Sequence, residues 1–309
     1  MRLGLLTACM PERPLEDVAA WAGAHGYEAL ELAAWPTIAR GTRPFVASHV
    51  AADAFDEREC ERVRAALDGN GLALSALAYY DNNLHPDPAE REAIHAHVRA
   101  CVDTAAALGG VPVGTFVGRD PGRSVADNLR EAERVLPPLV AYANERGVKL
   151  MIENCVMEGW HPDGYPGNLA YSPELWEWMF ELGLYLNFDP SHLLWLGVDP
   201  VAALKPYVHR VIHAHAKDAE TFPHERNRYG FFGRTSTREQ DPWDMGWWRY
   251  RIPGLGQVDF RGFVETLRAG GFDGVLSVEH EDPVHGGTPQ KVEQGLQLAH
   301  EHLKPLVSR

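Results

Sequence analysis

The sequence has few positively charged residues for its length. Lysine and arginine total 29 in a chain of 309 residues, against 43 aspartate and glutamate residues, and the formal net charge is -14. A surface with this excess of negative charge repels the phosphate backbone of DNA and RNA. We therefore expect no nucleic-acid partner.

Cysteine is also scarce. The four cysteines, Cys9, Cys60, Cys101 and Cys155, are far apart, and none belongs to a CxxC pair. This spacing predicts neither a disulfide framework nor a zinc site built from thiolates. Few and unpaired cysteines are typical of reducing compartments, so we expect a cytoplasmic protein.

Long hydrophobic runs are missing as well. The opening MRLGLLTACMPERP holds only a short apolar stretch, which Pro11 ends. That stretch is too short for a signal-peptide core or a membrane span. The sequence therefore predicts no targeting segment and no contact with a membrane.

The chain lacks a glycine-rich GxGxxG motif after its first apolar run, which disfavours a dinucleotide-binding sheet. Instead, short apolar runs alternate with longer segments of helical periodicity, such as 53–67 and 91–108, and glycine follows several of these segments. The apolar runs predict strands near 2–7, 27–33, 72–79, 112–117, 148–154, 184–189, 210–216 and 274–280. We therefore expect an α/β protein, a (β/α)8 TIM barrel that forms a single domain over 1–309.

A pair of prolines interrupts one of the expected helices. Pro137 and Pro138 fall inside the segment 125–145. Proline removes a helical hydrogen bond and clashes with the preceding turn. The helix is therefore predicted to kink or restart at this pair.

The apolar runs of the second half end on residue types that bind metals. The runs KLMIEN, LYLNFDPSH, VIHAHAKD and VLSVEHED place Glu153, Asp189, His215 and Glu279 at the ends of the last four predicted strands. In a barrel, the inward-facing residue at the carboxyl end of a strand lies in the active-site mouth. Three carboxylates and one imidazole suit Mn, Mg or Co and tolerate Zn, so we expect one divalent cation here. The alternative is that these carboxylates cap the following helices or form ion pairs.

These motifs carry a resemblance to a known family. ENC at Glu153, DPSH at Asp189 and His192, HAHAKD at His215 and VEHED at Glu279 resemble the xylose-isomerase-like barrels of the sugar phosphate isomerase and epimerase superfamily. The resemblance extends over the chain and includes GYEALEL in the second predicted strand. It implies a metal-dependent isomerase or epimerase of a small-molecule keto-sugar or keto-polyol, such as an inosose, that works through a metal-stabilised enediolate. It also allows a homo-oligomer, whose order the sequence does not fix.

The resemblance further implies catalytic roles for three residues. Glu153 and Glu279 match two glutamates that remove and return a proton on opposite faces of the substrate while they bind the metal. His192 matches a histidine that donates a hydrogen bond to the substrate oxygen where negative charge grows. The alternative for His192 is a helix-start histidine packed under its loop.

Two further residues belong to the seventh predicted strand. His213 shares a face with His215 and lies one layer deeper, so we expect it to be hydrogen-bonded rather than a metal ligand. Lys217 is expected near the mouth, where it contacts a substrate oxygen or pairs with Asp218 or Glu281.

An unusually long segment, 219–257, follows the seventh predicted strand. Long loops at the catalytic face are usually functional, so we expect a lid or a wall that stacks on a sugar. Its candidate substrate-binding residues are Arg226, Arg228 and Arg234 for a phosphate or carboxylate, and Trp247, Trp248 and Tyr250 for a sugar face. The alternative is that the aromatic residues pack the lid onto the barrel or form an oligomer contact.

A polar stretch, YYDNNLHPDP, follows the third predicted strand. It supplies Tyr80, Asn82, Asn83 and His85, which suit recognition of hydroxyl groups. Asn83 is our candidate for substrate binding. Asparagine and aspartate also favour turns, which explains the stretch almost as well.

Other functions are compatible with parts of this pattern. A lyase, such as an inosose dehydratase or a 3-oxo-glycoside-cleaving enzyme, would use the same enolate and the same metal. A phosphodiesterase of the endonuclease IV type would need more histidines from earlier strands, where LALSALAYY and PVGTFVGRD have none. A binding protein without activity would not need a complete ligand set.

Overall fold

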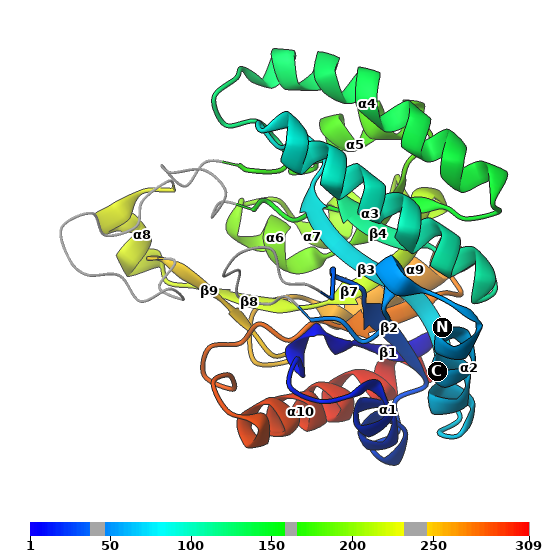
Figure 1. Cartoon of the computed structure of the whole chain (residues 1–309). Helices are drawn as coiled ribbons and strands as arrows, with labels where there is room; N and C mark the ends of the chain where they lie inside the picture. Colours follow the sequence, from blue (N-terminus) through cyan, green and yellow to red (C-terminus); the bar gives the residue numbers. More distant parts are fainter. Residues whose placement is uncertain (38–46, 158–165, 232–245, 309) are drawn as a thin grey trace.

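Eight parallel strands close into a barrel in a computed structural model that describes residues 1–37, 47–157, 166–231 and 246–308 (Figure 1). Their order around the barrel is β1-β10-β7-β6-β5-β4-β3-β2. The strands are β1 (Arg2–Leu6), β2 (Ala29–Ala33), β3 (Ala73–Asn82), β4 (Val113–Phe116), β5 (Leu150–Glu153), β6 (Tyr185–Phe188), β7 (Val211–Ala216) and β10 (Val275–Val278). Each falls on one of the eight predicted apolar runs, and the predicted (β/α)8 barrel is confirmed.

The strands are apolar because helices cover them from outside and side chains fill them from inside. All five residues of β2 and all four of β4 and of β5 are buried. The helices are α1 (Leu15–Ala24), α2 (Glu57–Asp68), α3 (Pro88–Ala107), α4 (Val125–Glu145), α5 (Pro173–Glu181), α6 (Pro190–Trp195), α7 (Pro200–Leu204), α9 (Phe260–Ala269) and α10 (Pro289–Val307). Short 3-10 turns lie at Thr7–Cys9, Ala52–Ala54 and Val208–Arg210. Among the described residues, no helix has the length and apolar content that a membrane span requires.

The helices begin where side chains satisfy their first backbone N–H groups. Asp56 accepts a hydrogen bond from the Glu59 amide at the start of α2, and Ser124 accepts one from the Asp127 amide at the start of α4. Several others, including α3 and α10, start with proline in their first turn, where its missing N–H has no cost.

Helix α4 runs unbroken from Val125 to Glu145, through Pro137 and Pro138, so the predicted restart does not occur. Its buried face continues across the prolines, since Leu136 and Leu139 are both buried. The carbonyls that lose their helical donors belong to Glu133 and Arg134, both exposed residues, so water can satisfy them. Packing on one face and solvent on the other therefore keep the helix in one piece.

The long segment after β7 is an antiparallel hairpin rather than a plain loop. It consists of β8 (Asp218–Thr221) and β9 (Trp248–Arg251), with α8 (Pro223–Tyr229) between them. Figure 1 shows α8 at the far end of this arm, away from the barrel. Arg234 lies outside the described residues.

The base of the hairpin is held by buried contacts. The aromatic cluster that joins it to the barrel consists of Val156, Trp195, Ala219, Trp247, Trp248 and Tyr250. Trp248 stacks on Trp195 of α6, with ring centroids 4.4 Å apart and planes 5° apart. These contacts agree with the predicted alternative, in which the aromatic residues pack this segment onto the barrel.

Asp218 fixes the return from the hairpin to α9. Its Oδ2 accepts hydrogen bonds from the amides of Gly254 (3.0 Å) and Gly256 (2.9 Å), and its Oδ1 accepts them from those of Ala219 (2.8 Å) and Val258 (2.9 Å). A Cβ atom on Gly256 would lie 2.3 Å from Asp218 Oδ1, so only glycine fits there. Asp218 therefore anchors this loop, and the predicted pairing with Lys217 is not seen.

The substitution Asp218→Asn should destabilise the fold, because an amide N–H₂ would face two backbone donors in a buried site. We expect the free energy of unfolding to fall by about 1–3 kcal/mol. Urea denaturation measures it. The matched control is Asp199→Asn at the exposed N-terminus of α7, where asparagine caps as well as aspartate, and no more than a few tenths of a kcal/mol should be lost. Equal effects of the two substitutions would contradict the anchoring role.

Candidate metal centre

The four predicted metal ligands converge at the carboxyl ends of neighbouring strands. Glu153 is the last residue of β5, Asp189 follows β6, His215 lies in β7 and Glu279 follows β10. Their ligand atoms all lie within 4.8 Å of one another. His215 Nδ1 is 3.2 Å from Glu153 Oε1 and 3.0 Å from Glu279 Oε2. The barrel thus brings together residues that are up to 126 positions apart in the chain, from 153 to 279.

The donor set fits a divalent cation. Asp189 Oδ2 and Glu279 Oε2 are buried and accept no properly oriented hydrogen bond from the described residues. Asp189 Oδ1, in contrast, caps α6 by accepting a hydrogen bond from the Ser191 amide at 2.8 Å. One oxygen of Asp189 therefore does what the capping alternative predicts, and the other faces Lys217 Nζ (3.1 Å) and His192 Nε2 (3.3 Å). Three carboxylates and one imidazole suit Mn²⁺, Mg²⁺ or Co²⁺ and tolerate Zn²⁺.

Asn154 sets the position of Asp189. Its Nδ2 donates to the Asp189 carbonyl (2.8 Å), and its Oδ1 accepts from the Asp189 amide (2.7 Å). This pair of bonds ties the end of β6 to the end of β5. The Asp189 carboxylate is consequently held on a fixed backbone.

Lys217 places a positive charge among the carboxylates. Its Nζ lies 2.7 Å from Glu279 Oε2, 3.1 Å from Asp189 Oδ2, 3.0 Å from Glu281 Oε2 and 3.9 Å from Glu153 Oε1. Only 1% of the residue is exposed. Of the two predicted partners, Glu281 is confirmed.

Charge pairing controls ionisation in this cluster. Burial alone would raise the pKa values of Glu153 and Asp189, but the charges of His215 and Lys217 for Glu153, and of Lys217 and His192 for Asp189, outweigh it and lower both pKa values. Burial lowers the pKa of Lys217, but the surrounding carboxylates raise it well above its ordinary value. Glu153 and Asp189 are therefore ionised at neutral pH, the form in which a carboxylate binds a cation.

His192 also faces the cluster. Its Nε2 lies 3.4 Å from Glu153 Oε1 and 3.3 Å from Asp189 Oδ2, and its Nδ1 is hydrogen-bonded to the Tyr250 hydroxyl at 2.9 Å. The hairpin therefore reaches the site through Tyr250 and fixes the orientation of this imidazole. The Tyr250 ring also lies 4.5 Å from Lys217 Nζ.

The remaining predicted substrate-binding residues lie in other surroundings. Asn83 is fully buried and donates to the Thr115 hydroxyl (3.0 Å) and the Phe116 carbonyl (2.6 Å), which ties it to the end of β4. The Arg226 guanidinium lies over the rings of Phe231 and Trp247 on the hairpin arm. Arg228 is exposed and lies over Tyr229, and Trp248 is buried against Trp195.

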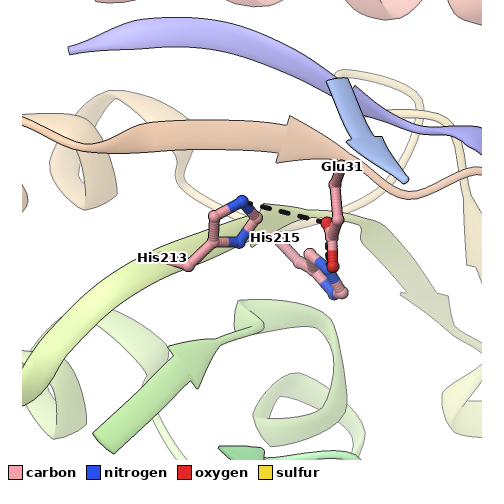
Figure 2. A group of neighbouring side chains, drawn as sticks. All are labelled: Glu31, His213 and His215. Atoms are coloured by element: carbon pink, nitrogen blue, oxygen red, sulfur yellow. Dashed lines mark hydrogen bonds and ion pairs between the residues drawn. The ribbon is translucent and has the colours of Figure 1, made fainter. Parts of the chain in front are cut away.

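A second polar group, missed in the sequence, lies under the metal centre. Figure 2 shows Glu31 of β2 pointing toward His213 and His215 of β7. Glu31 Oε2 is 2.9 Å from His215 Nε2, and Glu31 Oε1 accepts a hydrogen bond from the Tyr80 hydroxyl at 2.7 Å. Burial raises the pKa of Glu31, but His215 and His213 outweigh burial and bring it to about 2. A glutamate between leucines in a fully buried strand was the available signal, because such residues are rarely buried unless they are paired.

His213 is hydrogen-bonded, as predicted. Its Nδ1 lies 3.1 Å from Asn187 Oδ1, and its Nε2 lies 3.2 Å from Ser75 Oγ. Burial lowers its pKa to about 4, so the ring is neutral at pH 7.

A cavity of about 460 Å³ opens beside the centre, between the loops that follow β1 and β10. Its wall includes Met10, Pro11, Pro283 and Val292, and it reaches Glu281, the partner of Lys217. The wall is largely apolar, and the cavity is large enough for a ring-sized group.

The charge balance predicts the effect of Lys217→Met. Without the ammonium group, buried carboxylates lack a partner, and the metal-free protein should lose about 3–5 kcal/mol of its free energy of unfolding. Saturating Mn²⁺ should raise the Tm of the variant more than that of the parent, because the cation replaces the missing charge. Thermal unfolding in EDTA and in Mn²⁺ measures both. The exposed Lys205→Met serves as the control, and an identical Mn²⁺ effect in both variants would contradict the proposed compensation.

Comparison with known proteins gives relatives over the whole chain and over part of it. The uncharacterised protein YfiH of Bacillus subtilis (strain 168) is 28% identical over 341 aligned positions, which cover 100% of both chains. Inosose dehydratase of Clostridium perfringens is 29% identical over 156 residues, which cover 48% of this chain and 46% of that protein. The chain thus matches less than half the length of the dehydratase.

Solved structures share the fold at low sequence identity. D-psicose 3-epimerase of Clostridium cellulolyticum H10, solved with D-tagatose, has a TM-score of 0.65 at 14% identity, with 99% of both chains covered. A xylose isomerase domain protein of Planctomyces limnophilus has a TM-score of 0.67 at 18% identity, with 100% of this chain and 98% of that chain covered. The family described as "Xylose isomerase-like TIM barrel" matches this chain over residues 19–306. The chain therefore belongs to the xylose isomerase-like TIM barrel family.

Proposed function

We propose that this protein is a divalent-metal-dependent isomerase or epimerase of a keto-sugar or keto-polyol. The observation that supports it best is the convergence of Glu153, Asp189, His215 and Glu279 within 4.8 Å. Two of these four residues are glutamates at the ends of strands β5 and β10, which are not neighbours in the barrel. The set therefore combines a cation site with two carboxylate bases that approach it from different directions.

When bound, the cation would polarise the substrate carbonyl and acidify the neighbouring C–H bond. Glu153 and Glu279 would then transfer the proton. One carboxylate removes a proton from the substrate carbon, and the other donates a proton to the opposite face of that carbon. Both residues are largely buried, with 2% and 9% of their surface exposed, which limits the access of bulk water to the two carboxylates.

Lys217 and His192 are suited to the developing negative charge on the substrate oxygen. Lys217 carries an ammonium group, and His192 presents Nε2 to the same cluster while Tyr250 holds its other nitrogen. Positioned donors of this kind stabilise an enediolate without reorganising. The aromatic cluster at the base of the hairpin excludes water from this side of the site.

The relatives support the choice of substrate class. The partial match to inosose dehydratases and the structural likeness to an epimerase solved with D-tagatose both concern polyhydroxy compounds with a carbonyl group. Because folds are shared by different reactions, the likeness supports the class of substrate and not the individual sugar.

A lyase on the same enolate is the second candidate, and the cavity beside Glu281 favours it. A substrate with a second, less polar part would place that part in the apolar cavity while its keto-sugar ring lay at the metal centre. A 3-oxo-glycoside is such a substrate: its keto-sugar ring would lie at the metal centre, and its aglycone would be the leaving group in the cavity. An inosose dehydratase would use the same bases but would leave the cavity to solvent.

The test is incubation of the Mn²⁺-loaded protein in deuterium oxide with ketoses, inososes and 3-oxo-glycosides, followed by proton NMR and mass spectrometry. We expect solvent deuterium in a recovered isomer. A new unsaturated product or a released aglycone would establish the lyase instead. Neither product nor deuterium incorporation with any of these compounds would contradict both proposals.

Glu153→Gln should abolish turnover of the substrate found in that experiment, since the amide is not a base and is a weaker ligand. A loss of at least about 100-fold in kcat is expected. Glu174→Gln, an exposed glutamate of α5, is the matched control and should retain full activity. Full activity of the Glu153 variant would exclude Glu153 from the mechanism.

A further inference from the structure

Three carboxylates contact the two ring nitrogens of His215 from opposite sides. Nδ1 faces Glu153 and Glu279 of the metal centre, whereas Nε2 faces Glu31 at 2.9 Å. Figure 2 shows this second side, with Glu31 reaching across from β2 to β7. The two ring nitrogens of His215 therefore have different surroundings.

We propose that Glu31 is a positioning residue that keeps a proton on Nε2 of His215, so that Nδ1 is the nitrogen offered to the cation. The inference rests on the metal-dependent function proposed above and adds a residue to it. Carboxylates, which only accept hydrogen bonds, face both ring nitrogens, so a proton is favoured on each; a cation bound by Glu153, Asp189 and Glu279 would replace the proton on Nδ1, and Glu31 would keep the one on Nε2. The Asn187 amide nitrogen also lies 3.0 Å from Nε2, but it donates to the Tyr80 hydroxyl at 2.7 Å. An imidazole with a proton on Nε2 has its lone pair on Nδ1, on the side of Glu153 and Glu279.

The surroundings of Glu31 restrict it to this role. It is fully buried, and its other oxygen accepts a hydrogen bond from Tyr80, whose hydroxyl in turn accepts one from Asn187 Nδ2 at 2.7 Å. These bonds prevent the carboxylate from rotating toward the substrate. Glu31 therefore acts through His215 and does not touch the reacting atoms.

A second cation held by Glu31, His213 and His215 is the competing explanation, since their ligand atoms also lie within 4.8 Å. That ion would require His215 to give up both ring protons, because Nδ1 already belongs to the first set. It would also require His213 Nε2 to leave Ser75 Oγ, 3.2 Å away. The hydrogen-bonded arrangement needs neither change, so we favour one cation and a carboxylate–histidine pair behind it.

The first test measures Mn²⁺ binding by isothermal titration calorimetry and does not depend on turnover. Glu31→Ala removes the acceptor, whereas Glu31→Gln keeps an acceptor oxygen but loses the charge. We expect the dissociation constant to rise by about 10–100-fold in Glu31→Ala and by less in Glu31→Gln. Glu28→Gln is the matched control, because Glu28 lies three residues earlier and contacts Lys304 and the Leu3 amide instead, and it should bind Mn²⁺ like the parent protein.

The second test observes the proton itself. In the Zn²⁺-loaded protein with ¹⁵N-labelled histidine, the His215 Nε2–H signal should be shifted downfield and exchange slowly with water. Loss of this signal in His215→Gln assigns it, and Glu31→Gln should move it upfield and speed its exchange while circular dichroism stays unchanged.

Three results would overturn the proposal: unchanged Mn²⁺ affinity in folded Glu31→Gln and Glu31→Ala proteins, a proton on Nδ1 of His215 in the metal-loaded state, or two Mn²⁺ ions per chain of which one is lost in the Glu31 variants. Should Mn²⁺ bind as predicted while no keto-sugar is turned over, the proposed reaction fails and the role of Glu31 stands.

Discussion

The mouth of this barrel has to accommodate five carboxylates in a space from which water is largely excluded. Glu31, Glu153, Asp189, Glu279 and Glu281 surround His215 and Lys217, and an isolated buried charge among them would cost several kcal/mol. Positive charge therefore has to accompany the carboxylates, from Lys217 and His215 in the structure and, in the function proposed above, also from a cation. The positions of β5, β6, β7 and β10, the cap of α6 and the contact of the hairpin with His192 all serve this balance.

The balance also explains the layering of the site. At the rim, Glu281 lines a cavity, and Lys217 lies behind it as its partner. The groups below, Glu31, Tyr80, Asn187 and His213, bond to one another and to His215. The lower layer therefore fixes the position of His215, the ligand proposed for the cation.

Much of the fold could be predicted from the sequence, because parallel barrel strands are buried on both sides and appear as short apolar runs. The metal centre followed from the same regularity: a two-residue period and a common carboxyl edge bring Glu153, Asp189, His215 and Glu279 to one place. Glu31 was missed because one acidic residue in a strand has no neighbour in sequence that indicates its partner. Its bond to His215 spans 184 positions and depends on the closure of the barrel.

The long segment after β7 shows a different limit of sequence reasoning. Its aromatic and arginine residues indicated a lid that binds sugar, yet Trp248 packs on Trp195 and Tyr250 bonds to His192. Composition alone does not separate a residue that contacts a ligand from one that holds the wall in place. The role of Arg226 and Arg228 in binding a substrate stays a prediction.

The most direct measurement is anomalous diffraction from crystals of the protein grown with Mn²⁺. One strong peak is expected, within bonding distance of His215 Nδ1 and of oxygens of Glu153, Asp189 and Glu279, with His215 Nε2 still facing Glu31. A peak between Glu31 and His213, or none among the four residues at saturating Mn²⁺, would contradict a single metal centre built on this barrel.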